Sequence, residues 1–253
     1  MQFDVYFAIN TAKGLRPGVT PEPMEWSDIK KQILENENWC KQIDDYRETG
    51  DTNLKSSLPS INFVGRSVRG RANDAMIPTQ LFMIDIDHIP EDKDCRQVWD
   101  TLSMKVDWDW IVDNVILAHI SPSGHGIHII FKSQGYPSLI ENMNAVNEIF
   151  NFDEYGDYDT KVKDFARVSF AFKASEILYE SSRLLLSTES DFGSSLVNEA
   201  FTEEVQDGDS SKTPTKAKAP RSISENVFAK LIKLHFKLFY MNPSIVILAG
   251  GGP

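Results

Sequence analysis

The chain has 253 residues, of which 26 are basic and 37 acidic, so that its formal net charge is −11. This excess of negative charge argues against a protein that coats nucleic acid through overall positive charge, but it allows an enzyme that holds nucleotides through metal ions and a few local cations. With 41% hydrophobic residues and two widely separated cysteines, the composition predicts a soluble globular protein of the reducing cytoplasm, with neither a zinc site nor a disulfide framework.

The first third of the chain predicts short strands and a positively charged loop. Residues 3–9 alternate as in a strand, and residues 61–64 form a second short candidate. Arg66, Arg69 and Arg71 follow in a glycine-containing loop. Two interpretations of this trio are equally open: solvated loop charge, or a cationic rim that faces phosphates.

The most informative stretch, Leu81–His88, is an apolar run that ends in two carboxylates. The period of two in a strand predicts that Asp85 and Asp87 share one face with Met83, while the intervening apolar residues face the other side. Two carboxylates spaced by about 6–7 Å along a strand can share a hard cation. The simpler interpretation, which is the more frequent one for an isolated pair, is a strand that runs out into solvent.

The middle of the chain predicts a helix over 89–104, a short strand or turn over 108–112, and a hairpin of strands 115–120 and 127–131. The intervening turn, 121–126, is dense in serine, glycine and proline, whose exposed N–H and hydroxyl groups can cradle phosphate oxygens. His128 follows this turn directly. A lone histidine on a strand is commonly structural, but this position favours a functional role.

An amphipathic helix is predicted over 137–150, followed by an acidic turn over 153–159. Asp159 is a candidate third carboxylate. Arg167, at the entry to a predicted strand 168–172, is a candidate guanidinium for phosphate. Taken alone, each would be an ordinary surface charge.

The remaining sequence predicts a linker and a second segment. Residues 189–222 are acidic and then basic without apolar periodicity, as in a flexible linker, and residues 223–253 predict a helical segment. Its apolar end, 245–253, indicates either the start of a truncated further domain or a surface that needs a partner. No apolar run approaches the ~20 residues that span a bilayer, so that no membrane partner is expected.

The order of three motifs resembles the archaeo-eukaryotic primase, or prim-pol, superfamily: Asp85-x-Asp87, then Ser123-Gly124-x-Gly126-x-His128, then Asp159. The sequence more closely resembles the BT4734-like, or VirE N-terminal, domain family of Bacteroidetes and their phages or mobile elements. That resemblance spans about residues 30–185. It is carried by a lead-in (46–51, Lys55, 58–61, Phe63), the turn 121–124 and a third block, Asp159 with Asp164-x-x-Arg167.

The resemblance implies an α+β fold: an antiparallel RRM-like primase palm flanked by helices over residues 1–188, then the linker and a C-terminal helix. It implies catalytic Mg²⁺ or Mn²⁺ on Asp85, Asp87 and Asp159. The triphosphate of the incoming nucleotide would contact Ser123, Gly124, Gly126, His128 and Arg167.

The implied activity is that of a DNA primase or primase–polymerase. It would be metal-dependent nucleotidyl transfer from nucleoside triphosphates on a single-stranded DNA template, during replication of a phage or mobile element. A replicative helicase domain or protein would be a further partner. The chain departs from the family pattern at Ala174, where members usually carry an aspartate. Two alternatives stay open: a metal-dependent nuclease, and a non-catalytic module that binds DNA or nucleotides.

Overall fold

The computed structural model of the chain describes residues 1–182 except 8–9, 12–13, 16–19, 69–75 and 160–163. The predicted linker 189–222, the predicted helical segment 223–253, and Arg69 and Arg71 of the predicted cationic rim lie outside the described residues.

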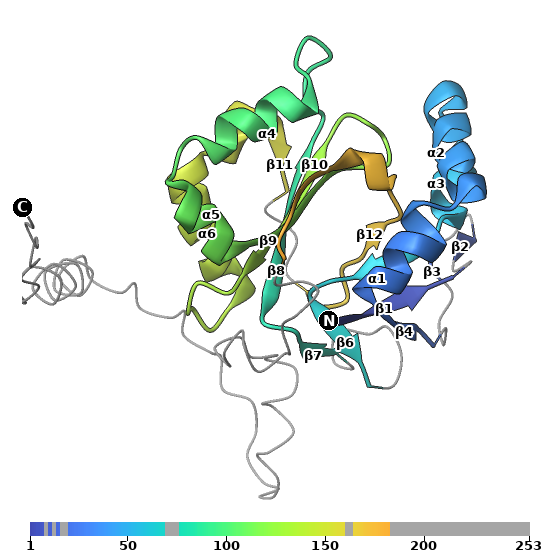
Figure 1. Cartoon of the computed structure of the whole chain (residues 1–253), viewed down its shortest axis with the longest axis horizontal. Helices are drawn as coiled ribbons and strands as arrows, with labels where there is room; N and C mark the ends of the chain where they lie inside the picture. Colours follow the sequence, from blue (N-terminus) through green and yellow to red (C-terminus); the bar gives the residue numbers. More distant parts are fainter. Residues whose placement is uncertain (8–9, 12–13, 16–19, 69–75, 160–163, 183–253) are drawn as a thin grey trace, which may run out of the picture. The chain divides into compact units, whose positions relative to one another are not determined.

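A five-stranded antiparallel sheet is built around the acidic strand (Figure 1). Its strand order is β11-β8-β10-β9-β13, with bounds Asp157–Tyr158, Leu81–Asp87, Ile127–Lys132, Val115–Ile120 and Ile177–Glu180. Strands β9 and β10 form the hairpin that the sequence predicts. Strand β8 lies between β10 and β11, so both of its edges are paired.

One face of this sheet is covered by helices α4 (Cys95–Ser103), α5 (Trp108–Asn114) and α6 (Leu139–Phe150) (Figure 1). The apolar cluster beneath them contains Phe82, Ile84 and Ile86 from β8, together with alternate residues of β10 and three residues of β9. The alternation predicted for the acidic strand is therefore the one the structure shows, because these three side chains enter a core that Asp85 and Asp87 do not enter.

The other face packs against a second antiparallel sheet, of order β12-β5-β1-β4. The bounds are Ser169–Phe170, Ser60–Asn62, Gln2–Tyr6 and Glu22–Glu25. Its apolar cluster combines Phe3, Val5 and Ile61 with Leu81 and Met83 of β8. Also on this side are α1 (Trp26–Ile29), the π-helical turn η1 (Lys30–Leu34), α2 (Glu37–Thr49) and α3 (Thr52–Ser57), of which α1, η1 and α2 contribute to this cluster.

Short elements complete the described part of the chain. They are the hairpin pairs β2 (Asn10–Thr11) with β3 (Gly14–Leu15) and β6 (Gly65–Ser67) with β7 (Met76–Pro78), and the 3₁₀ turns η3 (Phe152–Glu154) and η4 (Ala174–Glu176).

The prediction of a mixed α+β fold with antiparallel sheets is confirmed. Two local predictions were wrong. Residues 108–112 belong to helix α5 rather than to a strand, since Ile111 and Trp110 pack into the core beneath the helices. The helix predicted to start at Ile89 begins at Cys95, where the carboxylate of Asp94 accepts a hydrogen bond from the N–H of Arg96.

Candidate carboxylate and phosphate site

Three polar side chains form a row across adjacent strands of the five-stranded sheet. His128 of β10 is paired with Asp85 of β8 on one side and with His119 of β9 on the other. All three are buried, at 7%, 5% and 0% exposure respectively. Since residues directly opposite in antiparallel strands point to the same face, the row faces the second sheet and continues the apolar cluster there with polar groups.

Arg167 brings two of the predicted carboxylates together. One guanidinium nitrogen, Nη2, donates to Oδ2 of Asp85 and to Oδ2 of Asp159, at 3.0 Å in each case. The two oxygens can therefore be no further apart than twice that distance. The backbone N–H of Asp159 also donates to the carbonyl oxygen of Asp85 at 3.1 Å, which fixes the two segments side by side.

The pairing determines how these groups ionise. Burial by itself would raise the pKa of Asp85, but His128 and Arg167 outweigh it and hold that pKa well below its ordinary value of 3.8. Burial likewise disfavours the charged form of Arg167, but Asp85 and Asp159 more than compensate and raise its pKa. These shifts favour the charged forms of Asp85 and Arg167, and the Arg167 guanidinium bridges Asp85 to Asp159.

Asp87 has the opposite environment. Burial and the neighbouring charge of Asp85 raise the pKa of Asp87. Among the described residues, no hydrogen bond or ion pair reaches its carboxylate. A Cβ added at Gly126 would lie 3.1 Å from Oδ1 of Asp87 and 2.8 Å from the carbonyl oxygen of Ile86, so only glycine allows the turn to pass this close.

The donors present fit a hard divalent cation. Oδ1 of Asp85 is buried and accepts no hydrogen bond of good geometry, although Nε2 of His128 lies 3.2 Å away. Asp87 is a carboxylate without a hydrogen-bond or ion-pair partner in the described part of the chain. Carboxylate oxygens are the ligands that Mg²⁺ and Mn²⁺ prefer. Within the described ranges, no three His, Cys, Asp or Glu side chains are already in a metal-binding arrangement, and Arg167 binds both Asp85 and Asp159.

The predicted phosphate turn is held by its own hydrogen bonds. The hydroxyl groups of Ser121 and Ser123 are 2.9 Å apart, the N–H of Gly124 donates to the carbonyl oxygen of Ser121, and the N–H of His125 lies 3.3 Å from the Ser123 hydroxyl. Gly124 has a φ of 82°, in the left-handed region that favours glycine. Two N–H groups that could face an anion are thus already satisfied, which weakens the interpretation of this turn as an anion nest.

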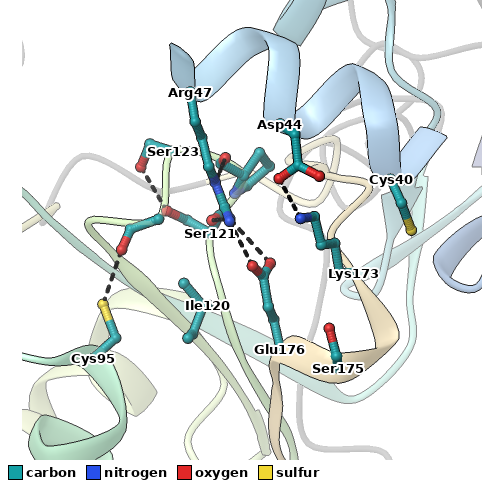
Figure 2. A network of polar contacts seen from close by, with 12 residues as sticks. Cys40, Asp44, Arg47, Cys95, Ile120, Ser121, Ser123, Lys173, Ser175 and Glu176 are labelled. Atoms are coloured by element: carbon teal, nitrogen blue, oxygen red, sulfur yellow. Dashed lines mark hydrogen bonds and ion pairs between the residues drawn. The ribbon is translucent and has the colours of Figure 1, made fainter. Parts of the chain in front are cut away.

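Sequence reasoning missed the residue that anchors this turn. Figure 2 shows Arg47 extending from α2 to the turn and to Glu176. Its Nε donates to the carbonyl oxygen of Pro122 at 2.8 Å, and its two terminal nitrogens bind both carboxylate oxygens of Glu176, at 2.6 and 3.0 Å. Arg47 and Glu176 are 129 positions apart, so no local pattern could have paired them.

Glu176 provides an acidic side chain close to Ala174, the position where members of the family usually carry an aspartate. Both residues lie in η4, and the carboxylate that this segment offers to the rest of the protein comes from Glu176. Beside this pair, Nζ of Lys173 binds Asp44 of α2 (Figure 2). The missing aspartate therefore does not leave this segment without an acidic anchor.

The second group that the sequence did not reveal is the pair Ser169 and His119. The hydroxyl of Ser169 lies 2.9 Å from Nδ1 of His128 and 3.4 Å from Nε2 of His119. Asp85, His128 and Ser169 thus have the residue types of a hydrolase triad, but Ser169 is only 1% exposed and cannot reach a substrate as a nucleophile.

The fold and the site define a class of protein: an α+β domain in which two packed antiparallel sheets hold a carboxylate–guanidinium centre. Residues 53–179 match the family described as BT4734-like, N-terminal domain. The match covers half of the chain, and the chain therefore belongs to this family. It includes the whole carboxylate centre and Glu176 but not Arg47. No curated protein and no solved structure matches the chain. In the described part, none of the helices has the length and apolar character needed to cross a bilayer.

Proposed function

We propose that this chain is a DNA primase or primase–polymerase, which transfers nucleotides from nucleoside triphosphates to a primer on a single-stranded DNA template. The observation that carries the proposal is the contact of Arg167 with both Asp85 and Asp159 beside His128. This contact supports the proposal because metal-assisted phosphoryl transfer needs side chains that can bind a cation next to side chains that can bind phosphate.

Each residue then has a role. Asp85, Asp87 and Asp159 would hold Mg²⁺ or Mn²⁺, which when bound would favour ionisation of the attacking hydroxyl and neutralise charge on the phosphates. Arg167 would leave its two carboxylates as the cation binds and would turn to the triphosphate. His128 would contact the triphosphate from the neighbouring strand. In this proposal, the five-stranded sheet with α4, α5 and α6 is the RRM-like palm.

The wider setting belongs to the same proposal. The resemblance to domains of Bacteroidetes phages and mobile elements supports replication of such an element in the cytoplasm, alongside a replicative helicase domain or protein.

A metal-dependent nuclease is the second candidate. The same carboxylates suit phosphodiester hydrolysis. The turn at 121–126 satisfies part of its own hydrogen-bonding groups, which weakens the argument that this turn binds a triphosphate. A non-catalytic binding module is the third, supported by Ala174 and by the net negative charge.

The deciding experiment is incubation of the full chain with single-stranded DNA, labelled nucleotides and Mn²⁺, with extension and template degradation followed together. We expect extension products that Asp85→Asn abolishes. Asp100→Asn is the matched control, because Asp100 is an exposed aspartate of α4, on the face of the sheet opposite to the carboxylate centre. Degradation without extension would favour the nuclease, and neither activity would favour the binding module.

His128 separates the same three functions. In the primase, His128→Ala should raise the apparent Michaelis constant for nucleotide more than it lowers turnover. In the nuclease, its loss as general acid or base should lower turnover by roughly two to four orders of magnitude at any substrate concentration. In a purely structural role, only thermal stability should fall.

A further inference from the structure

A buried hydroxyl from the second sheet holds the ring of His128. Ser169 is in β12, and its Oγ lies 2.9 Å from Nδ1 of His128 in the five-stranded sheet. Behind it, Nε2 of His119 is 3.4 Å from the same oxygen. Ser169 is therefore the point where the polar row Asp85, His128 and His119 is joined to the opposite sheet.

His119 is fixed in orientation and in tautomer. Its ring stacks on Phe172 with a centroid separation of 3.5 Å and an angle of 8° between the planes. Burial, with a smaller effect of His128, holds the pKa of His119 well below 6.5, so the ring is neutral. Its Nδ1 lies 3.0 Å from the carbonyl oxygen of Ile120, which can only accept, so Nδ1 carries the proton and Nε2 is an acceptor.

The Ser169 hydroxyl joins the two histidine rings. It has one proton and three polar neighbours: Nε2 of His119, the carbonyl oxygen of Phe170 at 3.2 Å, and Nδ1 of His128. The contact with Nδ1 of His128 is the shortest of the three, at 2.9 Å, so this nitrogen is the one that the second sheet holds. The other ring nitrogen of His128, Nε2, faces the carboxylate centre.

We infer that Ser169 and His119 are positioning residues: the Ser169 hydroxyl, held in turn by His119, binds Nδ1 of His128 and keeps its ring rotated so that Nε2 is the atom presented to the carboxylate centre. Nε2 lies 3.2 Å from Oδ1 of Asp85, the buried oxygen that lacks a well-aligned hydrogen bond. Functional histidines are commonly oriented in this way through the nitrogen that does not meet the ligand. The inference rests on the proposed function only in that nucleotide is the ligand that Nε2 would meet.

The geometry also explains why the second sheet is needed. Ser169 pairs with Ile61 of β5, so its hydroxyl is placed by the backbone of the second sheet rather than by the hairpin that carries His128. The ring is held in one orientation only when the two sheets are packed. Ser169→Ala would leave Nδ1 of His128 and Nε2 of His119 without the oxygen that links them.

The test reads nitrogen chemistry rather than activity. Long-range ¹H–¹⁵N spectra of the histidine side chains in the full chain should show protonated Nδ1 on His119, with His128→Gln and His119→Gln used for assignment. In Ser169→Ala we expect the His128 nitrogen signals to shift, because Nδ1 loses its hydrogen-bond partner, and in Ser169→Thr, which keeps the hydroxyl, to stay near those of the native chain. Affinity for dATP with Mn²⁺ should fall by about tenfold in Ser169→Ala and recover in Ser169→Thr.

Unchanged His128 nitrogen shifts in Ser169→Ala would overturn the proposal, as would equal dATP affinity of the native and Ser169→Ala chains. Ser169→Cys, which keeps the volume but weakens the hydrogen bonds, gives the same comparison if Ser169→Ala does not fold. If the native chain binds no dATP, the proposed function fails and the nitrogen shifts alone decide the inference.

Discussion

Arg167→Met should destabilise the metal-free protein and make its stability depend strongly on added Mn²⁺. Arg167 is the cation between Asp85 and Asp159, and the side chain of Asp85 is only 7% exposed. The methionine fills a similar volume without the charge, so the variant leaves two carboxylates facing one another. A divalent cation is the natural replacement for the charge that has been removed.

The size of the effect follows from the exposure of the pair. Removing one partner of a fully buried ion pair costs about 3–5 kcal/mol, but Asp85 keeps His128 and the Arg167 side chain is 32% exposed, so we expect about 2–3 kcal/mol. For a chain of this length, that loss lowers the melting temperature by about 5–10 °C.

The sign of the pH dependence is also fixed. Arg167 contributes to keeping the folded-state pKa of Asp85 below its unfolded value of 3.8. A carboxylate with a lowered folded pKa contributes stability above the unfolded value and loses it as the pH falls through the folded one. The difference between native and Arg167→Met proteins should therefore be full at neutral pH and shrink below pH ~4.

Differential scanning fluorimetry with and without Mn²⁺ measures all of this. Arg96→Met is the matched control: it removes the same charge from an exposed arginine that donates to the carbonyl oxygen of Ser175. We expect the control to melt close to the native protein, and Arg167→Met to melt lower and to gain more from Mn²⁺ than either. The reasoning is refuted if the two variants melt alike, or if Mn²⁺ stabilises native and Arg167→Met proteins equally.

Three further predictions concern neighbouring groups. Asp87→Asn should raise the melting temperature of the metal-free protein at pH 7, because burial and Asp85 raise the pKa of Asp87 and its charge therefore opposes folding. The gain should shrink as the pH falls through the raised folded-state pKa and be gone below the unfolded value of 3.8, and stabilisation by Mn²⁺ should be lost. Gly126→Ala should lower the free energy of unfolding in denaturant by about 1–3 kcal/mol, because its Cβ would meet the Ile86 carbonyl oxygen at 2.8 Å and the Ser121 hydroxyl at 2.9 Å. Gly135→Ala, in open space at φ 89°, should lower it by about 1 kcal/mol, and equal losses in the two variants would contradict the crowding argument. Arg47→Met should lower the free energy of unfolding by about 2–3 kcal/mol through loss of the Glu176 pair and the turn contacts, and should speed hydrogen exchange at Gly124. Lys41→Met, which breaks an exposed ion pair on the same helix, should change neither the stability nor the exchange rate. No change in exchange in Arg47→Met would show that the turn keeps its structure without Arg47.

The sequence by itself determined the acidic strand. Alternation assigned Phe82, Ile84 and Ile86 to one face and the two aspartates to the other, and the structure has that arrangement. It also determined the β9–β10 hairpin, because a strand's side-chain period and a turn rich in Ser, Gly and Pro are local properties. The helix at Trp108–Asn114 was not predicted, because over five residues an apolar pattern does not distinguish a strand from a buried helix turn.

Only the tertiary structure decided which charges meet. Arg167 and Arg47 are both ordinary basic residues in the sequence, yet one bridges Asp85 and Asp159 and the other clamps Glu176 to the turn. Ser169 is brought to His128 by the packing of one sheet on the other. Pairing between side chains on separate strands depends on register and sheet packing, which are fixed by the burial of the whole apolar face. The residues next to a given residue in the sequence therefore do not predict which distant residue it will contact.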